Sequence, residues 1–87
     1  MSEPTLLEFP CDYPIKVMGA AGAGLDTVVA QIVRRHAPDL SEGAIRTRAS
    51  RNGNYVAVTV TIRARHKGQL DAIYRELTAH HQVLIAL

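Results

Sequence analysis

The segment from Tyr55 to Arg65 constrains the fold most, because its apolar and polar positions alternate without a break. The positions that share one face are Val56, Val58, Val60 and Ile62. Three of them are valine and one isoleucine, β-branched residues that favour extended chain. Successive side chains of a strand point to opposite faces, so this strand has one apolar face and one mostly polar face. We therefore expect a sheet with one covered face and one open face.

Three further strands are predicted, each shorter. Residues 13–18 alternate, with Pro14 expected at the first position of the strand. Ile45 to Ser50 alternates next and leads into Asn52-Gly53, a dipeptide typical of hairpin turns because both residues accept positive φ. The segment 83–87 is expected to close the chain as a strand.

Two amphipathic helices separate these strands. Apolar residues recur at spacings of three and four from Leu25 to His36, with Pro38 ending that helix, and again from about Lys67 to Ala79. The resulting order, βαββαβ, predicts an α+β fold of the ferredoxin-like, split βαβ type, in which two helices cover one face of a four-stranded antiparallel sheet. The strands that begin near Tyr13 and Tyr55 should be central, and the Ile45 strand should lie at an edge.

The chain has 87 residues, which is enough for one small domain. We expect an irregular arm over residues 1–11, which contains two prolines, and a single ferredoxin-like (ACT-like) domain over residues 12–87. Leu6, Leu7 and Phe9 of the arm should pack against the core. A domain of this size buries only about 60–65% of its unfolded surface, so a homodimer is one way to add stability.

Composition indicates a cytoplasmic protein. No apolar stretch approaches the roughly 18 residues of a membrane span, and the first nine residues carry two glutamates where a signal peptide would be basic. Cys11 is the single cysteine and cannot form an internal disulfide, which fits a reducing compartment. We expect no membrane association.

Charge is distributed unevenly along the chain. Residues 1–42 hold three bases and six acids, whereas residues 43–87 hold seven bases and two acids. Several of the bases occupy positions opposite the apolar alternation and should project from the open face: Lys16, Arg46, Arg48, Arg63 and Arg65. Clustered cations attract an acidic protein partner or a small anionic ligand. The plainer interpretation is a solvated face whose charges keep an edge strand from pairing.

A nucleic-acid-binding protein that uses the same arginines is the alternative function. Sheet faces that bind RNA stack bases on aromatic side chains, and Tyr55 is the one aromatic residue expected on this face. The sparse aromatics therefore disfavour nucleic acid as the partner.

Five blocks of sequence resemble the YbeD-like family of small bacterial proteins of uncharacterised function. The blocks are Leu7-Glu8-Phe9-Pro10, Lys16-Val17-Met18-Gly19, Arg35-His36-Ala37-Pro38, the stretch 50–55 with its Gly53-Asn54-Tyr55, and Ile73-Tyr74-Arg75-Glu76-Leu77. The resemblance covers nearly the whole chain from Leu6 and implies a ferredoxin-like fold similar to ACT regulatory domains, in the bacterial cytosol. It also implies a suspected link to lipoylation, because genes of this family often neighbour the octanoyl transferase gene. It supplies no catalytic or binding residues.

The glycine-rich loop after the first strand is a candidate ligand site. Gly19, Gly22 and Gly24 lack the spacing of a dinucleotide fingerprint, and no Gly-Lys-Ser/Thr follows them as in a P-loop. Tight-turn geometry is the simplest role for these glycines. In ACT-like domains, however, the corresponding loop lines a site for small amino-acid-like ligands, which by analogy of fold makes these three glycines candidate ligand-binding residues.

No catalytic, metal or cofactor site is predicted. The adjacent pair His80 and His81 should diverge, and His36 and His66 lie apart from any cluster with ligand spacing. Cys11 stands beside Asp12, whose negative charge disfavours a reactive thiolate. The acidic residues form no evident pair for acid–base catalysis. The sequence thus favours a small non-catalytic binding or regulatory module, sensing a small ligand or regulating a partner enzyme, that requires no cofactor.

Overall fold

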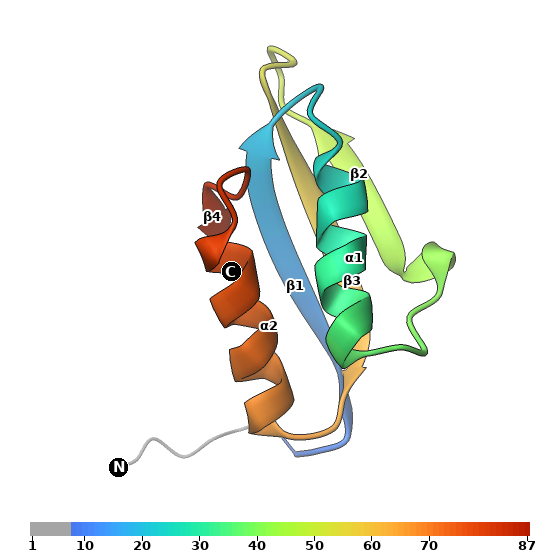
Figure 1. The fold of residues 1–87 in the computed structure, drawn as a ribbon. Coiled ribbons are helices and arrows are strands. Elements are labelled where there is room, and N and C mark those ends of the chain that lie inside the picture. Colours follow the sequence, from blue (N-terminus) through green and yellow to red (C-terminus); the bar gives the residue numbers. More distant parts are fainter. Residues whose placement is uncertain (1–7) are drawn as a thin grey trace.

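The computed structural model describes residues 8–87 (Figure 1). Its elements follow the predicted βαββαβ order with one short 3₁₀ turn, η1, inserted before the second strand. Their bounds are β1 Cys11–Ala20, α1 Leu25–His36, η1 Glu42–Ala44, β2 Ile45–Ala49, β3 Tyr55–Ala64, α2 Lys67–Ala79 and β4 Ile85–Ala86.

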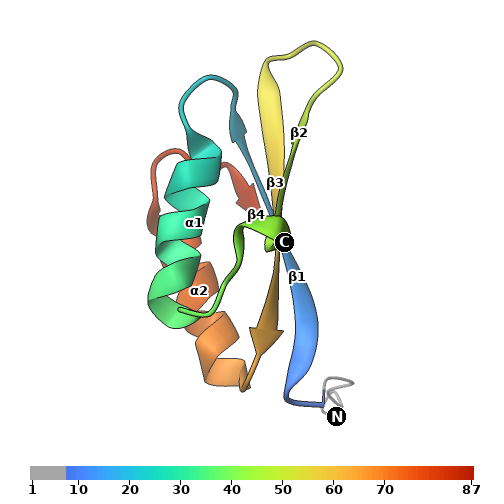
Figure 2. The ribbon, with the colours of Figure 1, turned by 90° about the vertical axis from the view of Figure 1, so that its right-hand side faces the viewer.

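The sheet has the strand order β2-β3-β1-β4, and every neighbouring pair is antiparallel. Both helices lie on one face of this sheet, and no helix among residues 8–87 covers the other face (Figure 2). The ferredoxin-like prediction is confirmed, with β1 and β3 central and β2 at an edge. The two helix bounds agree with the predicted segments because the apolar spacing of each helix marks its buried face along its whole length.

The core forms between the two central strands and the helices. β1 and β3 pair over ten residues in a register that sets Ile15 opposite Val60 and Val17 opposite Val58, and all four side chains are fully buried. α1 and α2 cover them with four further residues that are equally buried: Val29, Val33, Ile73 and Leu77. This is the covered face that the alternation in residues 55–65 predicted.

β1 is longer than predicted and contains Pro14 rather than starting at it. The strand begins at Cys11, and Pro14 pairs with Thr61. The N–H of Lys16 donates to the carbonyl oxygen of Leu87, which directly follows β4. The nitrogen of Pro14, two residues earlier, therefore faces the same side of β1. β4 pairs only with Val17 and Met18, so it places no backbone carbonyl opposite the nitrogen of Pro14. The missing N–H therefore costs no hydrogen bond to β4. A proline is tolerated there for the reason it is tolerated on an edge strand.

The C-terminal strand is shorter than the predicted segment 83–87. β4 comprises Ile85–Ala86, and both Leu84 N and Leu87 N donate to β1 carbonyls at its two ends. The interval of three residues between these donors shows that the strand bulges at its start. In the N-terminal segment, Phe9 packs against the core as expected, whereas Leu6 and Leu7 lie outside the described residues.

Polar contacts link the helices at the C-terminal end of α1. The Arg35 guanidinium lies 2.7 Å and His36 Nε2 lies 3.0 Å from the two carboxylate oxygens of Glu76 on α2. Gln69 is buried and bridges two segments, accepting from Arg65 N and donating to His36 O. These bonds fix the end of one helix against the side of the other.

Gly19 is required because backbone approaches it closely. It is buried in β1, and a Cβ at this position would clash with Gln82 O and come within 2.9 Å of Leu25 Cδ2. Gln82 O is backbone, so the turn before β4 would have to move to admit any side chain. The role of Gly19 is therefore to allow contact between β1 and the 80–84 turn.

Replacement of Gly19 by alanine should destabilise the fold by about 1–3 kcal/mol, because it overpacks a rigid contact. Gly43→Ala is the matched control: nothing lies within 4 Å of a Cβ there, and we expect a change within about 0.5 kcal/mol. Urea unfolding of the two variants measures the difference. Equal midpoints for both would show that the turn is free to shift.

Stability should also depend on Glu76 as the pH falls. Hydrogen bonds from Arg35, and then from His36, lower the pKa of Glu76 below its usual 4.5. Because the folded-state pKa is depressed, the stabilisation is present above about pH 4.5 and is lost as the pH falls through the folded-state value. The difference in free energy of unfolding between the wild type and Glu76→Gln, measured in urea titrations, should therefore become smaller below pH 4.5. A difference that stays constant down to pH 3 would contradict this.

Candidate binding surface on the open sheet face

The open face of the sheet is built from the side chains that alternate with the core. Arg46 and Arg48 project from β2, and Lys16 projects from β1; all three are exposed. Between them, β3 contributes Ala57 and Thr59, which are half-buried and short. The alternation that buries the core therefore also places cations on the opposite side of the same strands.

Strand register brings these side chains into rows across the sheet. Thr59 of β3 pairs with Arg46 on one side and with Lys16 on the other, so the two cations flank a threonine. Neighbouring strands lie about 5 Å apart, which puts the Cα atoms of Arg46 and Lys16 about 10 Å apart. A hollow of about 650 Å³ lies over this row, and we call it the basic hollow; its lining residues are Lys16, Arg46, Thr47, Arg48, Ala57 and Thr59.

The other two predicted cations lie apart from the basic hollow and have acidic partners. Arg63 Nη1 lies 3.4 Å from Asp12 Oδ1, its pairing neighbour on β1. Arg65 follows the end of β3, and its Nη2 lies 3.4 Å from Asp39 Oδ2. In contrast, no ion pair within residues 8–87 involves Lys16, Arg46 or Arg48. The five predicted cations thus divide into three that are clustered and two that are neutralised locally.

Apolar side chains occupy the β4 side of the open face. Met18 pairs with Ile85, and Leu87 exchanges backbone hydrogen bonds with Lys16, which puts Ile85 and Leu87 on the face that carries Lys16. Ile85 is 49% exposed and Leu87 is 67% exposed, and Tyr55 at the end of β3 is 49% exposed. The sequence does not mark this region, because residues 83–87 are all apolar and their pattern does not distinguish the side chains that the helices cover from those that stay exposed.

The predicted glycine site separates into two parts. Gly22 and Gly24 have positive φ, +85° and +72°, and line a hollow of about 410 Å³ between the loop and β2. The carbonyl of Gly24 accepts from Thr27 N and Val28 N, so this residue starts α1. Gly19, in contrast, is buried against Gln82 and does not line the hollow. Backbone geometry alone accounts for glycine at all three positions: positive φ at Gly22 and Gly24, and the close approach of Gln82 O at Gly19.

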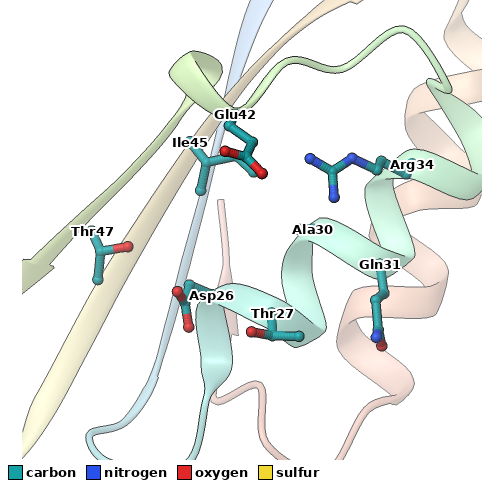
Figure 3. Close-up of a pocket in the computed structure, with 8 residues that line it drawn as sticks. All are labelled: Asp26, Thr27, Ala30, Gln31, Arg34, Glu42, Ile45 and Thr47. Carbon is teal, nitrogen blue, oxygen red and sulfur yellow. The ribbon is translucent and has the colours of Figure 1, made fainter.

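Besides these two hollows, a cleft of about 400 Å³ runs between α1 and β2 (Figure 3). The carboxylate of Glu42 and the guanidinium of Arg34 point toward one another across it, and Asp26 lies at its far end. Thr47 lines both this cleft and the glycine hollow. Ile45 and Thr47 are the β2 residues that line the cleft, and Ala30 is the small residue that α1 turns toward it. The sequence carries no motif that marks this cleft.

The histidines His36 and His66 of the helical layer have structural partners. His66 Nδ1 accepts from Gln69 N and caps α2, and His36 contacts Glu76. Burial, and then the neighbouring Tyr13 phenol, raises the pKa of the Tyr74 hydroxyl. Within residues 8–87, no group of three or more histidine, cysteine or acidic residues could hold a metal ion.

His80 and His81 differ from the sequence expectation. Their rings stack with centroids 4.7 Å apart instead of diverging, because they lie in the turn after α2 rather than on a regular element. His80 Nδ1 accepts from Gln82 N, which helps to shape that turn. The pair therefore belongs to the 80–84 turn that packs on Gly19.

Residues 8–87 thus form a two-layer α+β fold in which the helices leave one face of the sheet uncovered. In agreement, the solution structure of protein HP0495 from H. pylori superimposes with a TM-score of 0.74 over 99% of this chain and 90% of that chain. The two share 11% sequence identity, so this likeness shows the fold alone. Neither helix in the described range is long and apolar enough to cross a membrane.

The chain belongs to the family described as "Protein of unknown function (DUF493)", which its sequence matches over residues 4–87. A UPF0250 protein of Nitrosomonas europaea is 42% identical over the full length of both chains. UPF0250 proteins of Neisseria gonorrhoeae and Ectopseudomonas mendocina are 44% and 45% identical, over 99% and 98% of this chain and 94% of each relative. The predicted membership of this uncharacterised bacterial family is confirmed.

Proposed function

We propose that this protein is a non-catalytic binding module that docks on an acidic protein partner through the open sheet face. The observation that supports it is the basic hollow, where Lys16, Arg46 and Arg48 surround a floor of two short side chains. No ion pair with another described residue satisfies these cations. The partner would supply the missing carboxylates.

The open face has a cationic part and an apolar part, and this difference would fix the orientation of a bound partner. Arg46 and Arg48 lie on the β2 side, exposed Ile85 and Leu87 lie on the β4 side, and Lys16 of β1 stands between the two groups. Interfaces commonly combine an apolar centre with charges that fix register, and complementary charge accelerates encounter. A partner surface that joins carboxylates to an apolar patch would match both halves.

A second copy of the same face fits less well. In a two-fold interface the same patch meets itself, so the three cations of one copy would be brought near those of the other. Like charges that approach without counter-charges oppose association. This argument favours a different protein over a homodimer that uses this face.

Nucleic acid is the competing occupant of the basic hollow. Its phosphates would satisfy the same cations, but stacking of bases requires aromatic side chains, and Tyr55 is the one tyrosine, phenylalanine or tryptophan that residues 8–87 place on this face. We therefore place the acidic protein first. The suspected link to lipoylation would make enzymes of that pathway the first partners to test, with this protein as their regulator.

Charge reversal on the basic hollow should abolish acidic binding without unfolding the protein. The variant Arg46→Glu/Arg48→Glu changes two exposed side chains that point away from the core. Fluorescence anisotropy with labelled poly-L-glutamate at low salt should show affinity lowered by more than about tenfold. Binding by the wild type should itself weaken as salt screens the charges.

The control Lys67→Glu/Arg75→Glu makes the same change in net charge on α2, in the opposite layer, and should retain binding. A labelled single-stranded oligonucleotide is the second probe. If it binds more tightly than poly-L-glutamate, the nucleic-acid alternative replaces the proposal. If reversal on β2 and on α2 has equal effects, net charge alone is responsible and the face is merely solvated.

A further inference from the structure

The free edge of β2 is the strongest feature that the proposed docking face does not use. β2 lies at the edge of the sheet (Figure 1). Four of its five residues are exposed. Ser50 N donates to Tyr55 O, so in the alternating ladder the backbone groups of Arg48 and Arg46 also face β3. The N–H and C=O of Thr47 and Ala49 must then point outward.

The outward backbone groups have room beside them on both faces of the sheet. On the helix side lies the α1–β2 cleft, with Thr47 at its border and Asp26, Gln31 and Glu42 among its polar lining (Figure 3). On the open side lie Arg46 and Arg48. An added strand would therefore send alternate side chains into the cleft and over the arginines.

The charges select which strand can be added. A second β2 paired antiparallel on this edge would set arginines opposite arginines, and like charges directly opposite destabilise a sheet. Glutamate or aspartate at every second position would instead face Arg46 and Arg48 as cross-strand pairs. The same arginines that block self-pairing thus favour an acidic strand.

We propose that the β2 edge binds an extended acidic segment of a partner protein by strand addition. The segment carries carboxylates at alternate positions over Arg46 and Arg48, and small polar side chains between them enter the α1–β2 cleft. Its backbone bonds to the outward groups of Thr47 and Ala49. This inference rests on the proposed function and adds the conformation and the sequence pattern of the partner.

A blocked peptide, Thr-Glu-Thr-Glu-Thr-Glu-Thr, tests strand addition directly. In the wild type, peptide should slow hydrogen exchange at the amides of Thr47 and Ala49, which are otherwise open to solvent, and leave the amides of Arg46 and Arg48 unchanged. Unchanged exchange at Thr47 and Ala49 in the presence of saturating peptide would overturn the inference.

A pair of substitutions at one residue isolates the backbone. Thr47→Pro removes the outward N–H without removing a bond to β3, whereas Thr47→Val keeps that N–H. Isothermal titration should show peptide affinity about tenfold lower for Thr47→Pro and little changed for Thr47→Val, at equal melting temperatures. If Thr47→Pro does not fold, the exchange measurement on the wild type decides alone.

The outcomes separate this inference from the proposed function. Peptide binding that Arg46→Glu/Arg48→Glu abolishes but Thr47→Pro leaves intact overturns strand addition and supports docking on the open face. Binding that neither variant affects overturns both. A concentration-dependent dimer in sedimentation that Thr47→Pro dissociates would make a second copy the occupant and overturn the acidic segment.

Discussion

Pairing of β1 with β3 is the interaction on which the rest of the structure depends. These ten-residue strands make the longest ladder in the described chain, and their register sets Ile15, Val17, Val58 and Val60 together under the helices. A shift of one residue would turn every one of these side chains toward solvent. Burial of this apolar set therefore fixes the register, and the register in turn fixes which side chains meet on the open face.

The basic hollow is a by-product of that same register. Lys16 lies beside Thr59 because Val17 lies opposite Val58, and β2 brings Arg46 to the other side of the same threonine. None of the three residues contributes to the core, so the fold constrains where they stand but not what they are. Cations without acidic partners at such positions are more informative about binding than buried residues are, because packing alone does not require them.

The sequence predicted the fold well wherever a periodic pattern spanned a whole element. Both helices and the β3 strand show this, since each buries one continuous face. It failed at Pro14 and at β4, where the outcome depends on how far a neighbouring strand extends. The candidate site was only partly predictable for the same reason. Alternation along the strand predicts that Arg63 and Arg65 project from the open face. Their acidic partners, Asp12 and Asp39, come from distant parts of the sequence and are brought to them only by the tertiary structure.

Protection of an edge and recognition at that edge are compatible roles for the same residues. Charged side chains on an edge strand prevent indiscriminate pairing, which is how a sheet with an open end avoids aggregation. Here the protecting charges have one sign, and a cleft lies between β2 and α1 on the inner side of the strand. Arg46 and Arg48 therefore repel a second copy of β2, which carries the same arginines, but do not repel an acidic strand. Specificity of this kind needs no deep pocket, since exclusion of the wrong strands does most of the selection.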